Sequence, residues 1–442
     1  MGRLRAGFSK VDITPPVGVY LTGYILRDEP SKGVHDNLYA RALTLEDVDA
    51  GEKAALVSAD LLGLSRESVE RIRNEASEKT GIDPQSMIIA CTHTHSGPAT
   101  VNLRRLGEVD QEYLKVLERK IVDSIVQASE NMDEARIAVG RGSVRGIGFN
   151  REKRPDGPLD EELGVIRIEN LEGEVRCVVL NYTCHPVVLG PRNLLVSADY
   201  PGVVSRTVEE RLANCCLFTT GADGDIDPLV NLEAWGEGTF KDVEEIGRKI
   251  GDEAIKVAGN LKGVPEVRIG SLQKVLELPV KPPPKLEDAI KEAESAKERL
   301  RTLKTEGSEP GRVRVAEAMV EWAEDVLKHL REGTFPKVMP VEVTLIGINE
   351  ILLIAIPGEL FVEIGLKIKR RSPFKYTYLV GYGNGEVGYF PTAEALKRGG
   401  YAAKMAPKYF GVTFLKPKAE RVLEDGILTL AHELHNELWK KR

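Results

Sequence analysis

Several features that mark particular protein classes are missing from this sequence. It has five cysteines among 442 residues, an odd number without regular spacing, and this excludes a disulfide framework. No run approaches the roughly 18 consecutive apolar residues of a membrane-spanning helix. With a formal net charge of −7, the chain also lacks the basic footprint of a nucleic-acid-binding protein.

The compartment is indicated by two further absences. The N-terminal segment, residues 1–16, has basic residues but no apolar stretch after them, unlike a secretory signal. The cysteines lie mostly in apolar runs, where they behave as small buried hydrophobic residues. Free thiols of this kind persist in reducing surroundings. We therefore expect a cytoplasmic protein with no transmembrane segment and no nucleic-acid partner.

Strand-like and helix-like segments alternate along most of the chain. Alternation of this kind is typical of a layered α/β fold, so we expect mixed sheets with flanking helices in one domain over residues 1–442. The predicted strands cover residues 53–60, 87–93, 165–168, 175–182, 216–220, 341–356 and 376–380. The predicted helices cover residues 65–79, 111–131, 200–213, 243–261 and 421–441.

One segment, residues 281–335, differs in composition from the rest. It begins with Lys-Pro-Pro-Pro-Lys and continues as two charged helical stretches, separated by a helix-stopping break at residues 306–311. We interpret it as a helical hairpin inserted between strands. Its apolar stripe is expected to pack on the sheet, with a wall or lid over a pocket as the alternative. The stripe comprises Leu286, Ile290, Ala293, Leu300, Met319, Trp322, Val326 and Leu330.

Three of the seven histidines follow apolar, strand-like runs. His93 and His95 lie two positions apart, and therefore on one face, where the run 87–93 ends in a Ser-Gly-Pro turn. His185 ends the run 177–185 in the same way. Strand ends line the usual ligand crevice of open α/β sheets. The residues alone leave two interpretations open, metal ligands or hydrogen-bonded histidines of the core.

A carboxylate occupies a similar place later in the chain. Glu359 follows the apolar run 351–356 at a Pro-Gly turn, where it is either a partner of a helix dipole or a ligand. Two histidines and one glutamate with an open position are the usual recipe for a hydrolytic zinc site. By contrast, His432 and His435 have the wrong spacing for a zinc helix motif and are expected on the surface.

Acidic residues near these runs have less certain roles. The loop 221–228 contains three aspartates in five residues, which suits either a cation loop or a turn with aspartate caps, and it lacks the terminal Glu of a calcium loop. Asp60 and Asp199 each end a Ser-Ala-Asp triplet. Together with Asp225 of the loop, they are candidates for orienting the histidines, or equally for helix and turn caps.

These motifs, taken together and in order, resemble the neutral/alkaline (non-lysosomal) ceramidases. The resemblance spans residues 5 to about 415. It rests on residues 6–16, 33–41, 92–98, 181–186, 357–359, 388–392 and 399–401, which include Thr-His-Thr-His-Ser-Gly-Pro and Asn-Tyr-Thr-Cys-His-Pro.

The resemblance implies a ligand set and a reaction. Zinc-bound water would attack an amide carbonyl, while nearby donors stabilise the oxyanion and a protonated group assists departure of the amine. By similarity, the zinc ligands are His93, His185, Glu359 and Tyr389. The other implied active-site residues are His95 for proton transfer, Tyr401 and Arg151.

The substrate is expected to differ from ceramide. Family members that act on ceramide carry a secretory signal and a C-terminal immunoglobulin-like domain, and neither is evident in this sequence. We therefore expect a small-molecule or lipid-like N-acyl substrate, smaller or more polar than ceramide. Two alternatives are a metal enzyme of the same fold acting on an ester or a sugar-like compound, and a non-catalytic binding homologue.

Overall fold

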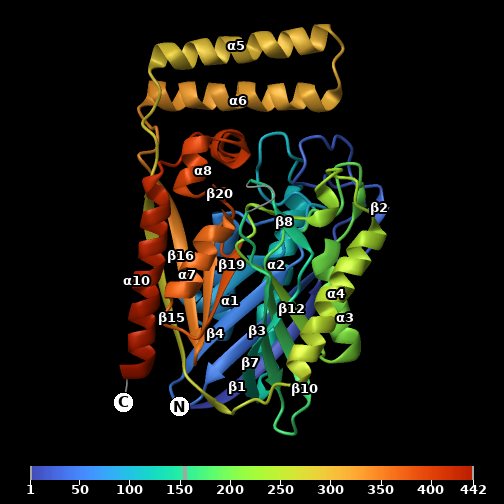
Figure 1. Cartoon of the computed structure of the whole chain (residues 1–442), viewed down its shortest axis with the longest axis vertical. Coiled ribbons are helices and arrows are strands. Elements are labelled where there is room, and N and C mark those ends of the chain that lie inside the picture. Colours follow the sequence, from blue (N-terminus) through green and yellow to red (C-terminus); the bar gives the residue numbers. More distant parts are fainter. Residues whose placement is uncertain (1, 153–156, 441–442) are drawn as a thin grey trace.

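The computed structural model describes residues 2–152 and 157–440, which form three main sheets with helices on their outer faces (Figure 1). The inner faces of all three sheets share one apolar core, to which Leu45, Val179 and Leu353 each contribute from a different sheet. The layered α/β architecture predicted from the sequence is therefore confirmed.

The first sheet has the order β14-β1-β3-β4-β5, with β6 also paired to β1. Its outer face packs on α1 and α2 through residues such as Val57, Ile72 and Ile121. Helix α1 connects β4 to β5, which pair in parallel and therefore end at the same edge. The bounds are β1 (Gly2–Asp12), β3 (Tyr39–Asp47), β4 (Glu52–Ala59), β5 (Met87–Cys91), β6 (Asp133–Glu134), β14 (Glu266–Val267), α1 (Arg66–Thr80) and α2 (Gln111–Glu130).

The second sheet has the order β12-β10-β9-β7, and α3 and α4 cover its outer face. Strands β10 and β12 run parallel, joined through α3. Helix α4 begins at a capping box in which Thr239 and Asp242 bond to each other's backbone amides. The bounds are β7 (Arg136–Ser143), β9 (Glu162–Glu169), β10 (Val175–Tyr182), β12 (Cys215–Thr220), α3 (Asp199–Arg211) and α4 (Phe240–Gly259).

The third sheet has the order β15-β16-β17-β19 and packs on α7 and α10. The apolar stretch 341–356, predicted as one strand, is instead two antiparallel strands, because Asn349 adopts a left-handed φ of 52° and turns the chain. The bounds are β15 (Ile269–Pro279), β16 (Val338–Ile348), β17 (Ile351–Ile356), β19 (Tyr376–Gly381), α7 (Val362–Arg371) and α10 (Lys418–Lys440).

Three two-stranded pairs join segments that are far apart in the chain: β2 with β11, β8 with β13, and β18 with β20. The last pair places Glu359 directly opposite Tyr389, and β8–β13 places Asn150 opposite Ile226. The bounds are β2 (Gly33–Val34), β8 (Gly148–Asn150), β11 (Leu195–Val196), β13 (Ile226–Pro228), β18 (Glu359–Leu360), β20 (Tyr389–Phe390), α8 (Ala393–Arg398) and α9 (Ala406–Phe410).

The predicted helical hairpin is present as α5 (Leu286–Thr305) and α6 (Pro310–Glu332), but its location corrects the expectation that it packs on a sheet. It connects β15 to β16 and lies across the end of the molecule that carries β8 and β20 (Figure 1). The buried residues of α6 meet loops and α9 rather than strands; Ala318, for example, packs with Leu106 and Tyr409. The hairpin therefore covers the end of the fold where strand-end residues gather.

Candidate metal centre and substrate cleft

Three histidines converge where β5 and β10 end. Ligand atoms of His93, His95 and His185 all lie within 4.8 Å of one another, and His95 Nε2 is 3.1 Å from His93 Nε2. His93 has a left-handed φ of 69°, a conformation that costs a non-glycine residue energy and tends to persist at functional sites. The turn after β5 thus brings its two histidines to the end of the neighbouring sheet.

Backbone carbonyls fix which ring nitrogen of each buried histidine carries the proton. His93 Nδ1 lies 2.8 Å from the carbonyl oxygen of Leu62, and His185 Nδ1 lies 2.9 Å from that of Asp223. A carbonyl only accepts hydrogen bonds, so both Nδ1 atoms donate and both Nε2 atoms present lone pairs. Burial lowers the pKa of His93 to about 3 and that of His185 to about 4. Both rings are therefore neutral near pH 7, the state that binds metals.

Glu359 completes this group from the β18–β20 pair. Its Oε2 atom lies 3.2 Å from His185 Nε2. In the described part of the chain, neither of these buried atoms has a hydrogen-bond partner. Buried polar atoms are normally paired, and a cation between the two would satisfy both. The donor set of two imidazoles and a carboxylate therefore fits a bound metal ion of the zinc type.

Tyr389 reaches the same place because β18 and β20 are in register. Its hydroxyl accepts a hydrogen bond of 3.0 Å from Arg151 Nη2. Arg151 is itself held by Asp227 Oδ1 at 2.9 Å and by the carbonyl oxygen of Gly224 at 2.8 Å. The structure thus brings Arg151 and Tyr389 into contact beside Glu359.

The acidic loop 221–228 supports the site through three separate contacts. Asp223 receives His185 on its backbone carbonyl, Asp225 accepts from Val362 N and from Asn150 Nδ2 at 2.8 Å each, and Asp227 pairs with Arg151. The carboxylate of Asp223 accepts from the Tyr382 hydroxyl, so each of the three carboxylates has a protein partner. Among the described residues, the one group of metal-type ligands found is the histidine cluster. The loop therefore acts as a set of caps and supports.

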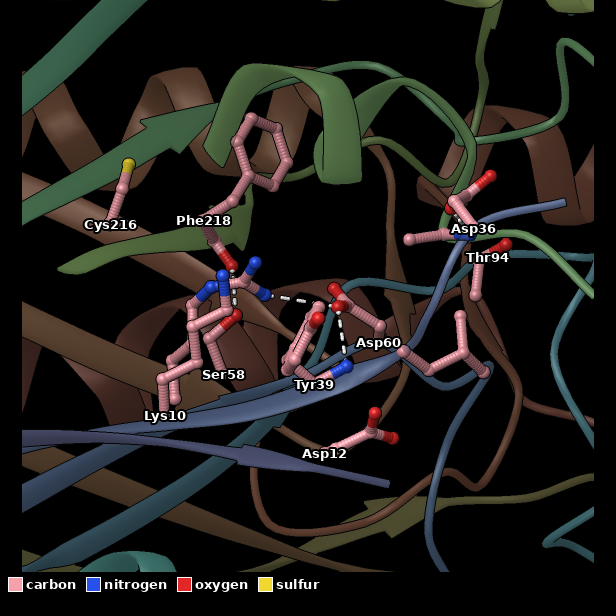
Figure 2. Close-up of polar contacts among 12 residues, drawn as sticks. Lys10, Asp12, Asp36, Tyr39, Ser58, Asp60, Thr94, Cys216 and Phe218 are labelled. Atoms are coloured by element: carbon pink, nitrogen blue, oxygen red, sulfur yellow. Dashed lines mark hydrogen bonds and ion pairs between the residues drawn. The ribbon is translucent and has the colours of Figure 1, made fainter. Parts of the chain in front are cut away.

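Asp60 and Asp199 were candidates for orienting the histidines or, equally, for caps, and the structure gives their carboxylates partners other than histidines. Asp60 Oδ2 accepts from Tyr39 N at 2.9 Å and from Arg41 Nη1 at 3.0 Å, within the polar cluster of Figure 2. Asp199 accepts from the backbone N of Leu189 and Tyr200 at the start of α3. Asp225, the third candidate, also bonds no histidine with its carboxylate.

Two supporting residues were missed from the sequence. Tyr382 stacks on the His93 ring with centroids 3.7 Å apart and planes 10° apart, and its hydroxyl donates to Asp223 Oδ1 at 2.8 Å. Asp223 is thus the residue that links Tyr382 to His185. Tyr382 directly follows β19, so its position after a buried strand was the available signal.

A cleft of about 500 Å³ opens from this cluster toward the hairpin. The metal-centre end of its wall is polar, and its outer part is aromatic and aliphatic. Its lining includes His95, Arg151, Tyr389, Tyr401, Leu26 and Trp235. The Tyr401 ring meets Tyr389 edge-on, with centroids 5.9 Å apart. The structure therefore brings together His93, His95, His185, Glu359, Tyr389, Tyr401 and Arg151.

Sequence comparison identifies the family. A sequence model described as neutral/alkaline non-lysosomal ceramidase, N-terminal, matches residues 4–223. The chain belongs to this family. It is 27% identical over 282 residues to the neutral ceramidase of Pseudomonas aeruginosa, covering 58% of this chain and 42% of that protein. It is also 27% identical over 229 residues to the neutral ceramidase of Drosophila melanogaster, covering 47% of this chain and 32% of that protein.

The fold agrees with this membership. The crystal structure of neutral ceramidase from Pseudomonas aeruginosa matches 99% of this chain and 75% of its own, with a TM-score of 0.77 and 19% identity. The sequence alignments cover less than half of each of these two curated relatives. In the described residues, each helix is too short or too polar to cross a bilayer.

Proposed function

We propose that the protein is a zinc-dependent hydrolase that cleaves the amide bond of an N-acyl substrate. One observation carries the proposal. The buried, neutral imidazole of His185 and the buried carboxylate of Glu359 present unpartnered atoms to each other, beside a largely apolar cleft. The relatives are neutral ceramidases, and this supports an amide as the bond that is cleaved.

The residues that would hold zinc are His93 and His185 through Nε2, together with Glu359 and Tyr389. His95 is left outside this set because the family resemblance implies a proton-transfer role for it. When bound, zinc lowers the pKa of a water molecule and polarises a carbonyl group. Arg151 donates to the Tyr389 hydroxyl, and this contact orients the phenol oxygen toward Glu359.

Two cleft residues supply the remaining chemistry. His95 presents an imidazole beside the proposed ligands, with Nε2 3.1 Å from His93 Nε2. From there it would take a proton from the attacking water and pass it to the leaving amine. The hydroxyl of Tyr401 is a donor for the oxyanion that forms at the carbonyl. Loss of one preorganised donor of this kind typically costs about 2.7–4 kcal/mol of transition-state stabilisation.

The cleft suggests the class of substrate. Its volume of about 500 Å³ lies inside the range of roughly 300–1,000 Å³ typical of small-ligand sites. Apolar residues such as Leu26 and Leu106 line the part away from the metal centre. We therefore propose a small-molecule or lipid-like N-acyl compound. All five cysteines are buried free thiols, which supports a reducing compartment, the cytoplasm.

The test combines elemental analysis with a substrate panel. The purified protein should contain about one zinc per chain. It should hydrolyse N-acyl amines in preference to matched esters and to sugar derivatives, which test the alternative reactions. His93→Ala and Glu359→Ala should abolish both zinc binding and activity, whereas His432→Ala, on the exposed face of α10, should change neither. Full activity after exhaustive chelation, or in His93→Ala, would refute the proposal.

A further inference from the structure

We propose that helix α6 of the hairpin, acting through Arg314, holds the outer wall of the cleft in place and thereby selects N-acyl substrates by chain length. Arg314 is a positioning residue, which acts on substrate specificity by holding the cleft wall. The inference rests on the proposed function, because selectivity requires a substrate that lies in this cleft. The hairpin, a charged insertion between two strands, would then affect substrate selection without contacting the proposed metal ligands.

The contact that carries the inference joins α6 to the cleft wall. Arg314 Nε donates to the carbonyl oxygen of Ile25 at 2.8 Å, and Nη2 donates to that of Leu26 at 2.7 Å. Its Nη1 lies 3.5 Å from a carboxylate oxygen of Asp28. The planar guanidinium group presents several donors in a rigid fork, which suits two consecutive carbonyl groups.

The segment held by Arg314 is itself part of the cleft. Gly23, Tyr24, Ile25 and Leu26 all line the cavity. The side chain of Leu26 remains 49% exposed, and it lies against α6: a Cβ atom on Gly311 would fall 2.6 Å from Leu26 Cδ2. The first turns of α6 therefore fix the position of residues 25 and 26.

The same helix supports two other lining segments. Ala318 and Met319 pack in one apolar cluster with Ile25, Leu106 and Tyr409, each of which lines the cleft. Ion pairs reinforce this contact on the outside of the cluster. They join Arg104 to Asp325, and Arg105 to Glu317 and Glu321. One rigid element thus backs three parts of the wall.

The metal centre is built from different elements. Its proposed ligands follow β5 and β10 or belong to the β18–β20 pair, and Leu62 and Asp223 hold the histidine rings. The inner end of the lining segment, Gly23, faces His95, whereas Arg314 holds its outer end, Ile25 and Leu26. Release of that outer end should therefore leave the proposed ligands and His95 in place. It should weaken the binding of only those substrates whose acyl chains are long enough to touch that part of the wall.

The experiment compares Arg314→Ala with Arg312→Ala in the full-length, zinc-loaded protein. Arg312 is an exposed residue two positions earlier on the same helix and is the matched control. The substrates are the acetyl and the palmitoyl amide of one amine, with kcat and KM measured separately. For Arg314→Ala, the KM for the palmitoyl amide should rise about tenfold, as for loss of a charge-assisted hydrogen bond. The kinetics on the acetyl amide and the zinc content should stay at the control values.

Equal losses on the two amides, or no loss on either, would overturn the inference. Arg314→Lys keeps the charge without the planar fork and should fall between the wild type and Arg314→Ala, which provides a second variant if alanine prevents folding. If the wild type cleaves neither amide, the proposed function fails independently of this inference.

Two further measurements test the role of Arg314 without relying on enzymatic turnover. Hydrogen exchange of the amides in residues 23–28 should accelerate in Arg314→Ala but not in Arg312→Ala, while exchange in β5 stays unchanged. When binding of the two amides to metal-free protein is measured by calorimetry, Arg314→Ala should lose affinity for the palmitoyl amide but not for the acetyl amide. Unchanged exchange at residues 23–28, or unchanged selectivity in binding, would overturn the role of Arg314.

Discussion

Removing a single hydroxyl group behind the metal centre tests whether its support is specific. In Tyr382→Phe, the ring that stacks on His93 stays, but the donor to Asp223 Oδ1 at 2.8 Å is lost. The other oxygen, Asp223 Oδ2, already has no hydrogen-bond partner in the described part of the chain. The variant therefore leaves a buried carboxyl group without its hydroxyl donor.

The size of the effect follows from these contacts. An unsatisfied buried polar group costs about 1–3 kcal/mol of the free energy of unfolding. Asp223 also holds the Nδ1 of His185 through its backbone carbonyl, so a shift of this residue misorients a proposed ligand. Loss of such outer contacts typically lowers metal affinity by about 10–100-fold. Both losses should appear in Tyr382→Phe.

Tyr378→Phe is the matched control for this prediction. Tyr378 lies on β19, the strand that Tyr382 directly follows; it is equally buried, and it donates to the carbonyl oxygen of Gly140 at 3.2 Å, away from the metal centre. Urea unfolding of the metal-free proteins should show comparable destabilisation of both variants. Zinc affinity, measured by competition with a fluorescent chelator, should fall only in Tyr382→Phe. Wild-type zinc affinity in Tyr382→Phe would refute the role given to Asp223.

Two further predictions address the cleft and the polar cluster behind it. In Gly23→Ala, the new Cβ would lie 2.3 Å from His95 Nδ1, so His95 must move, and turnover should drop while the zinc content stays unchanged. Gly18 has a similar positive φ and nothing within 4 Å of the new Cβ, so Gly18→Ala should keep wild-type turnover. Equal kinetics in the two variants would contradict the role given to the Gly23–His95 contact. Burial raises the pKa of Glu209, but Arg41 and Lys10 outweigh this effect and hold the pKa in the folded protein below its ordinary value. The ionised carboxylate therefore stabilises the fold at pH values above its ordinary pKa. This stabilisation is lost as the pH falls through the lowered pKa of the folded protein. Glu209 pairs with Lys10 Nζ at 2.7 Å and with Arg41 Nε at 2.9 Å. The stability difference between the wild type and Glu209→Gln, from urea unfolding at pH 7 down to pH 3, should therefore shrink toward low pH, and a constant difference would contradict the contribution of these two ion pairs.

Local sequence patterns were sufficient for the layered fold and for the strand-end histidines. Apolar runs that end in a turn are visible over a few residues, and His93, His185 and Glu359 each follow such a run. A buried strand delivers the residue after it to the edge of the sheet whatever the rest of the chain does. The resemblance to the ceramidases added Tyr389, Tyr401 and Arg151, which no periodicity indicates.

Pairings between distant segments could not be deduced in this way. The sequence by itself determined that carboxylates lie near strand ends, but only the tertiary structure decided that Asp223 supports His185 while Asp60 bonds Arg41. A carboxylate takes the nearest unsatisfied donor in space, and that donor often belongs to another sheet. For the same reason, the sequence left open whether the charged hairpin packs on a sheet or forms a wall over a pocket. Its partners, the loops at residues 25–28 and 104–106, carry no pattern that points to α6.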